Sequence, residues 1–524
     1  MPNGLLTTAT TLAELTGLLE ATALSALRCP ECDGTITVEG PDLRLMRSAG
    51  VRRMGSRGPA RLLLRAGVAR CVPPGPRSAT PDALDIAILD RALSPGELSA
   101  LRAARTVLVP WLNSPPPRSI TRGKVSTSLT HARLAPPLPA SVHPSALPAV
   151  VPYQRPEPPP MHAVAAYYRL SEEARRFSNG GPCAQLLVER AAAYLDADVF
   201  SVPLANCTVG LMVALRAALG DPVAGRRHVI VPSFTFTATA CAIAWAGFVP
   251  LFIDVDTAAW QLDPSELSRV LAEQGNRVAG VLATSTFGTA PPGAAREAWL
   301  ATCDAAGVPL VVDSAAAFGA RDEHGRLVGS DGATHVFSFH VTKPFAVGEG
   351  GLLVTGDPEV ARRAESLVNF GIDGPERTSA VAGINAKMSE LHAAGALAML
   401  DRFEPVLARR RGAVEHLRAL LGDLPVRFQS GAEGSTWQVF QLLMPDARRR
   451  DAALRAAERL RIEARSCFDP PLHRHPAFAE HPVAGDLRGT AHLAARSLSL
   501  PMANDLSLDE LERIAEVVRE GLAG

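Results

Sequence analysis

The chain has 524 residues, of which 47% are hydrophobic and 5% aromatic, and its 53 Lys and Arg residues balance 53 Asp and Glu residues. This is the composition of a globular protein with room for about three domains, so disorder throughout the chain is excluded. A net charge of zero with no basic block argues against nucleic acid or an anionic membrane surface as a partner, because both need an excess of Lys or Arg on one face.

The sequence carries no signal for export or membrane insertion. The start of the chain lacks a basic region before an apolar core, and no uninterrupted apolar run reaches about 18 residues. The eight Cys residues are scattered apart from Cys29 and Cys32, so they do not form a disulfide framework. We therefore expect a cytoplasmic protein with reduced thiols and no membrane contact.

Residues 1–100 are predicted to form a small N-terminal domain. Apolar residues recur at helical spacing in residues 12–27, 83–93 and 94–104. Cys29 and Cys32 have the spacing of half a zinc site, but a structural zinc needs four ligands and no second pair of this kind follows. We expect no metal, and a domain that binds a substrate or a partner.

A proline-rich linker is predicted at residues 101–160, which hold 14 of the 43 prolines. Such a segment cannot continue a helix or a central strand, so it separates the N-terminal domain from the rest. We place a large domain at residues 161–405 and a small C-terminal domain at 406–524. The first helix of the large domain, at residues 161–177, is expected to pack on the small domain.

The large domain alternates short β-branched runs with Ala-rich helical stretches. This alternation predicts an α/β fold with a mostly parallel sheet covered by helices on both faces. In such sheets, ligands bind at the carboxyl ends of the strands, so chemistry is sought directly after each run. The predicted strands are residues 228–232, 249–254, 279–284, 308–313, 335–339 and 351–355.

An acid and an amine follow two of these strands. Asp313 ends the strand 308–313, and Lys343 follows the strand 335–339 by four residues. Only three residues of the chain are lysine and the other 50 basic residues are Arg, so a lysine that remains suggests amine chemistry that Arg cannot perform. A plain buried ion pair between Asp313 and Lys343 is the alternative.

Three further features point to one cofactor. Cys207 and Thr208 open a helix whose free backbone N–H groups suit a phosphate, and Phe236 follows a strand where its ring can lie against a flat ligand. The glycine-rich turn 348–351 lets backbone pass close to a bound group. An amine, a carboxylate, a phosphate site and a stacking ring together meet the needs of pyridoxal phosphate.

These residues also lie in blocks that resemble the DegT/DnrJ/StrS family of pyridoxal-phosphate sugar aminotransferases, from about Ser178 to Leu522. The resemblance implies a fold-type-I pyridoxal-phosphate-dependent transferase with a small C-terminal α+β domain, to which this chain adds a separate N-terminal extension. It also implies a homodimer with two active sites at the subunit interface. The blocks include VVDSAAAFGA, FSFHVTKPFAVGEGG, INAKMSELHAAGALAMLDR, PPLHRHPAF and LSLPMANDLSLDELERI.

The resemblance implies a role for each matching residue. Lys343 corresponds to the Schiff-base lysine and Asp313 to the partner of the pyridine nitrogen, which makes them the catalytic pair. His340 matches a histidine whose role we interpret as structural. Either Asn385, which we prefer, or Lys387 reaches the phosphate of the neighbouring subunit. The remaining cofactor-binding residues are Cys207, Thr208, Phe236 and Ser338.

Two positions depart from the family pattern. Ala316 stands where Gln or His usually contacts the phenolic oxygen of the cofactor, and Ser285 stands where His is common. These changes are consistent with a different acceptor, weaker cofactor retention or a degenerate enzyme. Lys343 argues against the dehydratase branch of the family, where a His replaces it.

The sequence predicts a transaminase that moves an amino group, from glutamate, to a small-molecule keto substrate. A nucleotide-linked keto-sugar is the leading acceptor. A cyclitol or another natural-product ketone is an alternative acceptor. A regulator or scaffold that binds pyridoxal phosphate without catalysis is the alternative from another class.

Overall fold

The computed structural model divides the chain into two compact units, Met1–Ala146 and Leu147–Gly524. In the first unit it describes six strands, and in the second it describes residues 150–373 and 377–524.

The six strands of the first unit form two small sheets. In one, β1 (Arg44–Arg47) pairs antiparallel with β2 (Gly50–Arg53). The other has the order β3 (Arg61–Arg65), β4 (Val68–Val72), β5 (Asp85–Leu89) and β6 (Thr106–Pro110). Its first two pairings are antiparallel, and β5 runs parallel to β6.

Two of these strands correct the sequence analysis. The helix expected at residues 83–93 is wrong, because strand β5 lies inside this range and pairs with a strand on each side. Its β-branched Ile86 and Ile88 alternate, and such a short apolar run fits a strand as well as a helix. Strand β6 lies inside the range 101–160, so regular structure extends into the first part of the predicted linker.

The other predictions for this unit fall outside the described residues. They are the two helices at 12–27 and 94–104 and the pair Cys29 and Cys32.

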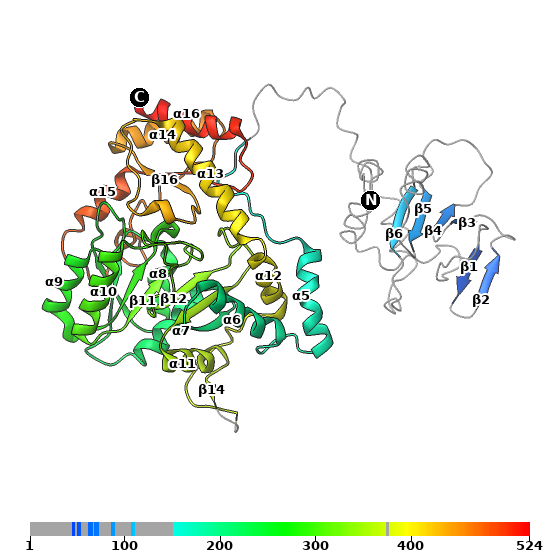
Figure 1. Cartoon of the computed structure of the whole chain (residues 1–524), viewed down its shortest axis with the longest axis horizontal. Helices are drawn as coiled ribbons and strands as arrows, with labels where there is room; N and C mark the ends of the chain where they lie inside the picture. Colours follow the sequence, from blue (N-terminus) through cyan, green and yellow to red (C-terminus); the bar gives the residue numbers. More distant parts are fainter. Residues whose placement is uncertain are drawn as a thin grey trace. The chain divides into compact units, whose positions relative to one another are not determined.

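The second unit is built on a sheet of seven strands, with helices on both sides (Figure 1). The strand order is β7 (Phe200–Leu204), β13 (Gly351–Thr355), β12 (Thr334–Ser338), β11 (Leu310–Asp313), β10 (Val278–Thr284), β8 (His228–Pro232) and β9 (Val249–Ile253). Only β13 runs antiparallel to its neighbours. The predicted α/β fold with a mostly parallel sheet is confirmed, and β7 is the strand that the sequence analysis missed.

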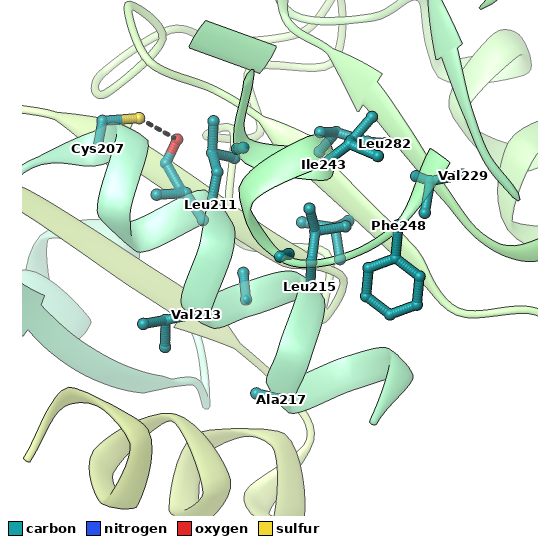
Figure 2. Close-up of a cluster of buried hydrophobic side chains, with 14 of the residues drawn as sticks. Cys207, Leu211, Val213, Leu215, Ala217, Val229, Ile243, Phe248 and Leu282 are labelled. Carbon is teal, nitrogen blue, oxygen red and sulfur yellow. Dashed lines mark hydrogen bonds between the residues drawn. The ribbon is translucent and has the colours of Figure 1, made fainter. Parts of the chain in front are cut away.

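Alternate residues of the strands face two hydrophobic cores. On one face, Val229, Val336 and Leu353 join α7 (Cys207–Leu219), α8 (Thr237–Trp245) and α11 (Pro358–Val368). Figure 2 shows part of this cluster, in which Leu215 of α7 lies toward Ile243 and Leu282. Strands that are covered by helices on both faces have nearly continuous apolar sequences, which explains why most of these strands were predictable.

The opposite face of the sheet is covered by two groups of helices. Next to β12 and β13 lie α5 (Met161–Ala174), α6 (Pro182–Leu195) and α12 (Glu390–Leu400). Next to β8, β9 and β10 lie α9 (Pro264–Gln274) and α10 (Gly293–Ala306). Among the helices of the described residues, none is both long and apolar enough to cross a membrane.

The C-terminal part is a small α+β domain with its own core. Helix α16 packs on α13 and α14, and two antiparallel strands complete the domain. In Figure 1 these helices lie together at one end of the unit, beside the C-terminus. The elements are α13 (Phe403–Leu421), β16 (Phe440–Leu443), α14 (Ala447–Arg459), α15 (Arg488–Arg496), β17 (Ser497–Leu500) and α16 (Leu508–Ala523).

The expected packing of the first helix on the small domain is wrong. Helix α5 packs against α12 and α6, which belong to the large domain. The segment before it, residues 151–157, contacts the small domain instead: Val151 forms a parallel bridge with Ile462 and is 1% exposed. The prolines between this segment and α5 keep the two from forming one continuous helix, and α5 begins directly after Pro160.

Candidate active site

Asp313 ends β11 at the carboxyl edge of the sheet, as predicted, and its carboxylate is buried. Thr239 of α8 donates a hydrogen bond from Oγ1 to Oδ2 of Asp313 at 2.7 Å, and the amide of Ala315 donates to Oδ1 at 3.2 Å. Burial raises the pKa of Asp313 above its ordinary value, against the lowering effect of these hydrogen bonds and of the nearby Lys343. The carboxylate is therefore held in place while its charge lacks a close partner.

Lys343 lies in the loop after β12. Its amide donates to the carbonyl of His340 at 2.9 Å, and the amide of Val341 donates to Gly348 at 2.8 Å, so the loop folds back on itself. The amine donates to Oε1 of Gln438 at 3.3 Å. Burial lowers the pKa of this amine, although the acidic groups of Cys207 and Asp313 act in the opposite direction.

Asp313 and Lys343 thus face the same region without touching. No ion pair joins them in the described part of the chain, although each shifts the pKa of the other. The plain ion pair left open by the sequence is therefore not what these residues form.

Helix α7 begins beside them. Asn206 caps it by accepting a hydrogen bond from the amide of Val209 at 2.9 Å. The amides of Cys207 and Thr208 come earlier in the helix than any residue with a partner inside it, so they can donate to an anion. Gly351 passes this turn so closely that a Cβ there would lie 3.0 Å from the amide nitrogen of Cys207.

The thiol of Cys207 has a different environment from its amide. It lies in the core cluster with Sγ 3.8 Å from the carbonyl oxygen of Val336, a contact that Figure 2 draws. Burial raises the pKa of this thiol well above its usual range, so it stays protonated. The predicted phosphate contact of Cys207 accordingly falls to its backbone.

Two other predicted cofactor residues lie at the same edge. Phe236 stands at the start of α8 with 63% of its surface exposed, so its ring is available to a ligand. Ser338 ends β12 and is buried, with Oγ accepting from the amide of His340 at 3.3 Å. His340 itself bonds to Thr342 at 2.8 Å, which agrees with a structural role.

Asn385 and Lys387 lie on a segment that runs beside residues 369–370. Asn385 is exposed and pairs through its backbone with Asn369. Lys387 donates from Nζ to Oδ1 of Asn369 at 3.0 Å and lies 4.5 Å from the centre of the Phe370 ring. The amine of Lys387 therefore already has partners within its own chain, whereas Asn385 is exposed. This difference supports Asn385 as the residue that reaches the neighbouring subunit.

One of the two departures from the family pattern, Ser285, lies in a polar network. Ser285 bonds to Ser314 at 3.1 Å, and Ser314 bonds to Nδ1 of His335 at 2.9 Å. Nε2 of His335 lies 2.8 Å from Asp331. Burial alone would raise the pKa of Asp331, but His335 and a nearby Arg lower it below its usual range.

Sequence reasoning missed the residues that the small domain contributes. Thr436 donates to the carbonyl of Ala316 at 2.6 Å, and Gln438 follows in the same segment to reach Lys343. Lys343 also shares a pocket with residues of this domain and of the segment 154–157, including Arg410, Asn504 and Glu157. No local pattern marks these residues, because each comes from a part of the sequence far from Lys343.

The arrangement fits pyridoxal phosphate. Asp313 is a buried carboxylate that forms no ion pair with any described residue, so it suits a protonated pyridine nitrogen. Lys343 supplies an amine of lowered pKa, and α7 supplies an anion site. These features, on a doubly covered and mostly parallel sheet, define a pyridoxal-phosphate-dependent enzyme of the α/β class. When bound, the cofactor supplies an aldehyde that takes up an amino group and a ring that withdraws electrons.

Comparison with known proteins agrees with this class. Residues 163–519 match the model of the DegT/DnrJ/EryC1/StrS aminotransferase family. The chain is 35% identical over 373 residues to Protein Rv3402c of Mycobacterium tuberculosis, which covers 71% of this chain and 90% of that protein. It is 35% identical over 263 residues to the L-glutamine:scyllo-inosose aminotransferase of Streptomyces griseus, which covers 48% of this chain and 60% of that protein.

A solved structure extends the comparison to the fold. DesI, crystallised in the presence of its TDP-sugar product, has a TM-score of 0.64 and 33% sequence identity, covering 72% of this chain and 94% of that chain. The chain therefore belongs to the DegT/DnrJ/EryC1/StrS aminotransferase family, and the protein is a pyridoxal-phosphate-dependent aminotransferase.

Proposed function

We propose that the protein transfers the amino group of glutamate to the ketone of a nucleotide-linked sugar. The observation that carries the proposal is the half-buried amine of Lys343, whose pKa is lowered, near the buried carboxylate of Asp313 at the carboxyl edge of the sheet. The donor amine becomes a ketone while the acceptor ketone becomes an amine, so the exchange needs no outside oxidant or reductant. The similarity to DesI, whose structure was determined in the presence of its TDP-sugar product, supports this acceptor class.

The roles of the catalytic pair follow from their surroundings. Lys343 holds the cofactor and then moves a proton at the substrate carbon, a task for which a lowered amine pKa is suited. Asp313, held by Thr239 at 2.7 Å, keeps the pyridine nitrogen protonated. The start of α7 and Ser338 bind the phosphate, and Phe236 covers one face of the ring.

We infer that the active unit is a homodimer in which Asn385 of one subunit completes the phosphate site of the other. Asn385 is exposed, and so are the apolar side chains of Phe236, Trp245 and Phe370. Light scattering should report a dimer. A cofactor-saturated monomer with full activity would contradict this part of the proposal.

The direct test supplies L-glutamate and a panel of ketones and follows 2-oxoglutarate and the amine product by mass spectrometry. The panel contains nucleotide-linked keto-sugars and scyllo-inosose, and Lys343→Ala is the matched inactive control. Mass spectrometry of any ligand that copurifies narrows the panel. Transfer from L-glutamate to none of these ketones would count against the proposed function and favour the non-catalytic scaffold.

A cyclitol is the second candidate acceptor. Both departures, Ser285 and Ala316, replace larger polar residues of the family pattern with small ones, which changes the shape of the site. The similarity to a scyllo-inosose aminotransferase supports a cyclitol ketone as the acceptor. Faster turnover of scyllo-inosose than of any nucleotide-linked sugar in the same panel would select this candidate.

A further inference from the structure

A chain of hydrogen-bonded side chains runs from Ser285 to Asp331, and the proposed reaction does not use it. Ser285 bonds to Ser314 at 3.1 Å, and Ser314 bonds to Nδ1 of His335 at 2.9 Å. Nε2 of His335 lies 2.8 Å from Oδ1 of Asp331. Ser314 is 0% exposed and His335 is 2% exposed, so Ser314 is closed to a substrate and is no nucleophile of a Ser-His-Asp triad.

One end of the chain lies at the carboxyl edge of the sheet. Ser285 directly follows β10, and its amide donates to the carbonyl of Asp313 at 2.9 Å. The turn that Ser285 begins also packs on Ala316, because a Cβ at Gly288 would lie 2.7 Å from the carbonyl oxygen of Ala316. Ligands of parallel sheets bind at this edge, so Ser285 stands among the residues that border the ligand site.

The other end of the chain carries a fixed charge. Burial would raise the pKa of Asp331, but His335 and Arg296 lower it below its usual range, so this carboxylate is ionised near neutral pH. Arg296 lies 3.9 Å from Oδ2 of Asp331 and 3.4 Å from Asp322, and Asp322 also pairs with Arg326 at 2.9 Å. Two arginines thus already face the two aspartates. Burial opposes a further cation at this place, which favours a neutral imidazole at His335.

The charge of Asp331 determines the direction of every bond in the chain. An ionised carboxylate only accepts, so the proton of the imidazole lies on Nε2, and Nδ1 keeps a lone pair that accepts from Ser314. Each serine has one hydroxyl proton, so Ser314 has none left and Ser285 must donate to it. In the described part of the chain, Oγ of Ser285 has no other hydrogen-bond partner, so its remaining lone pairs are free.

We propose that Asp331 and His335 are positioning residues that leave Ser285 able only to accept a hydrogen bond from a ligand, and that Ser285 accepts it from a hydroxyl group of the amino acceptor. A sugar and a cyclitol both carry such hydroxyl groups. A carbonyl or ether oxygen that faced Ser285 would find no donor there. The proposal rests on the proposed function, because it names the residue that selects a hydroxylated acceptor.

The first test locates the protons directly. Neutron diffraction from deuterium-exchanged crystals of the cofactor-loaded protein should show deuterium on Nε2 of His335 and none on Nδ1. The hydroxyl deuterium of Ser285 should point to Ser314. Deuterium on Nδ1 of His335 would reverse the chain and overturn the proposal, whatever the acceptor is.

The second test compares two aspartates that both contact Arg296. Asp331→Asn puts an amide beside His335 that can donate as well as accept, so the fixed direction is lost. The KM for scyllo-inosose or for a nucleotide-linked keto-sugar should rise about threefold to tenfold, the size expected for one hydrogen bond. The half-reaction with L-glutamate should stay within about twofold of the wild-type rate.

Asp322→Asn is the matched control. It removes a carboxylate that lies 3.4 Å from Arg296, but the contacts of Asp322 within the described residues do not include His335. The acceptor KM and the glutamate half-reaction should both stay near their wild-type values. A rise of the acceptor KM as large as that of Asp331→Asn would trace the effect to charge alone and overturn the proposal.

A further variant guards against misfolding of Asp331→Asn. Ser314→Ala breaks the same chain by removing one hydroxyl, and it should raise the acceptor KM to a similar extent. Ser201→Ala is its control, because the buried hydroxyl of Ser201 has no hydrogen-bond partner among the described residues. An unchanged acceptor KM in Ser314→Ala, or equal slowing of both half-reactions, would assign the chain to folding alone.

Failure of the proposed function is distinguishable from failure of this inference. If the wild-type protein converts none of the ketones, the proposed function fails and the assignment of an acceptor hydroxyl to Ser285 fails with it. The neutron map still decides the direction of the chain in that case. Conversion of a ketone together with deuterium on Nδ1 of His335 would keep the proposed function and reject the role of Asp331 and His335.

Discussion

At the scale of single residues, the catalytic residues were more predictable than the residues that hydrogen-bond to them. Asp313 and Lys343 stand directly after strands, so an apolar run followed by a reactive side chain was enough to find them. Gln438 and Thr239 were not predicted, although they hold the two reactive groups. Each lies more than seventy residues along the chain from its partner, at separations of 95 and 74, and no local pattern records such a contact.

The first prediction concerns the amine of Lys343, whose pKa burial lowers from 10.5. Only the neutral amine attacks an aldehyde, so the rate at which apoprotein takes up pyridoxal phosphate should rise with pH and reach its midpoint below 10.5. Stopped-flow absorbance measures the profile. Lys343→Ala should abolish the band of covalently bound cofactor, whereas Lys387→Ala should retain it. A profile centred at or above the value for free lysine would refute the assignment.

Substitution of Asp313 should have different effects on the stability of the protein and on its activity. Burial raises its pKa above 3.8, so the ionised form destabilises the folded apoprotein at any pH above that range. Asp313→Asn removes this charge, so the apo variant should melt no lower than wild type near neutral pH, and its advantage should shrink as pH falls toward 3.8. Activity should nevertheless drop by roughly 10² to 10³-fold, because an amide does not keep the pyridine nitrogen protonated. Calorimetry and steady-state rates check the two halves, and wild-type turnover would reject the role.

The substitution Ala316→Gln tests the effect of the departure from the family pattern at this position. In the family pattern, Gln or His at this position donates to the phenolic oxygen of the cofactor, and the methyl group of Ala316 offers no such donor. Ala316→Gln should tighten pyridoxal phosphate by roughly 1.5–3 kcal/mol, the value of a charge-assisted hydrogen bond. Fluorescence titration gives the affinity. If the variant also blocks the native ketone but still reacts with glutamate, Ala316 makes room for the acceptor; unchanged affinity and turnover would reject both effects.

At the scale of elements, six strands of the large sheet were predictable, including the edge strand β9, whereas the opposite edge strand, β7, was not. Strand β7 contains Pro203, which reads as a strand breaker because it cannot donate to a neighbour. It is tolerated because β7 is at the edge of the sheet and pairs only with β13. The helix expected at residues 83–93 failed for a related reason: a short apolar run alone does not distinguish helix from strand, and pairing decides.

Gly351 is the first residue of β13 and lies against the backbone at the start of α7. A larger residue at this position should therefore weaken phosphate binding. An alanine Cβ would lie 2.9 Å from the carbonyl of Phe337 and 3.0 Å from the amide of Cys207, and backbone must move to admit it. Gly351→Ala should cost about 1–3 kcal/mol in unfolding free energy and weaken pyridoxal phosphate more than it weakens pyridoxal. Gly412→Ala, where nothing lies within 4 Å, is the matched control. Equal loss for both ligands would show that the phosphate site is not affected.

At the scale of the whole molecule, the change in composition marked the position of the catalytic region, but it placed the boundary slightly too late. The proline-rich range 101–160 was read as a linker throughout. Its last residues instead attach to the small domain: Val151 exchanges backbone hydrogen bonds with Arg461 and Glu463 at 2.9 and 3.0 Å. The sequence could not show this, because proline content indicates the local backbone conformation of a segment but not which domain the segment packs against.

Two truncations should therefore behave differently. Removal of residues 1–146 keeps the second compact unit whole, and we expect a folded protein that binds pyridoxal phosphate. Removal of residues 1–155 also deletes Tyr153, whose hydroxyl bonds to Ser499 at 2.6 Å, and Arg155, which pairs with Glu510 at 2.5 Å. Losing the buried side chains of Val151 and Tyr153 should cost roughly 3–6 kcal/mol.

Thermal unfolding and the spectrum of the bound cofactor distinguish the two products. The shorter deletion should retain the melting temperature of the catalytic unit, and the longer one should melt lower and lose cofactor more readily. The pocket beside Lys343 is the reason for the second effect, since residues 154–157 form part of its wall. Equal stability and equal cofactor retention in both products would show that this segment contributes nothing to the catalytic unit. Aggregation of the shorter deletion would instead make the first unit an obligatory part of the fold.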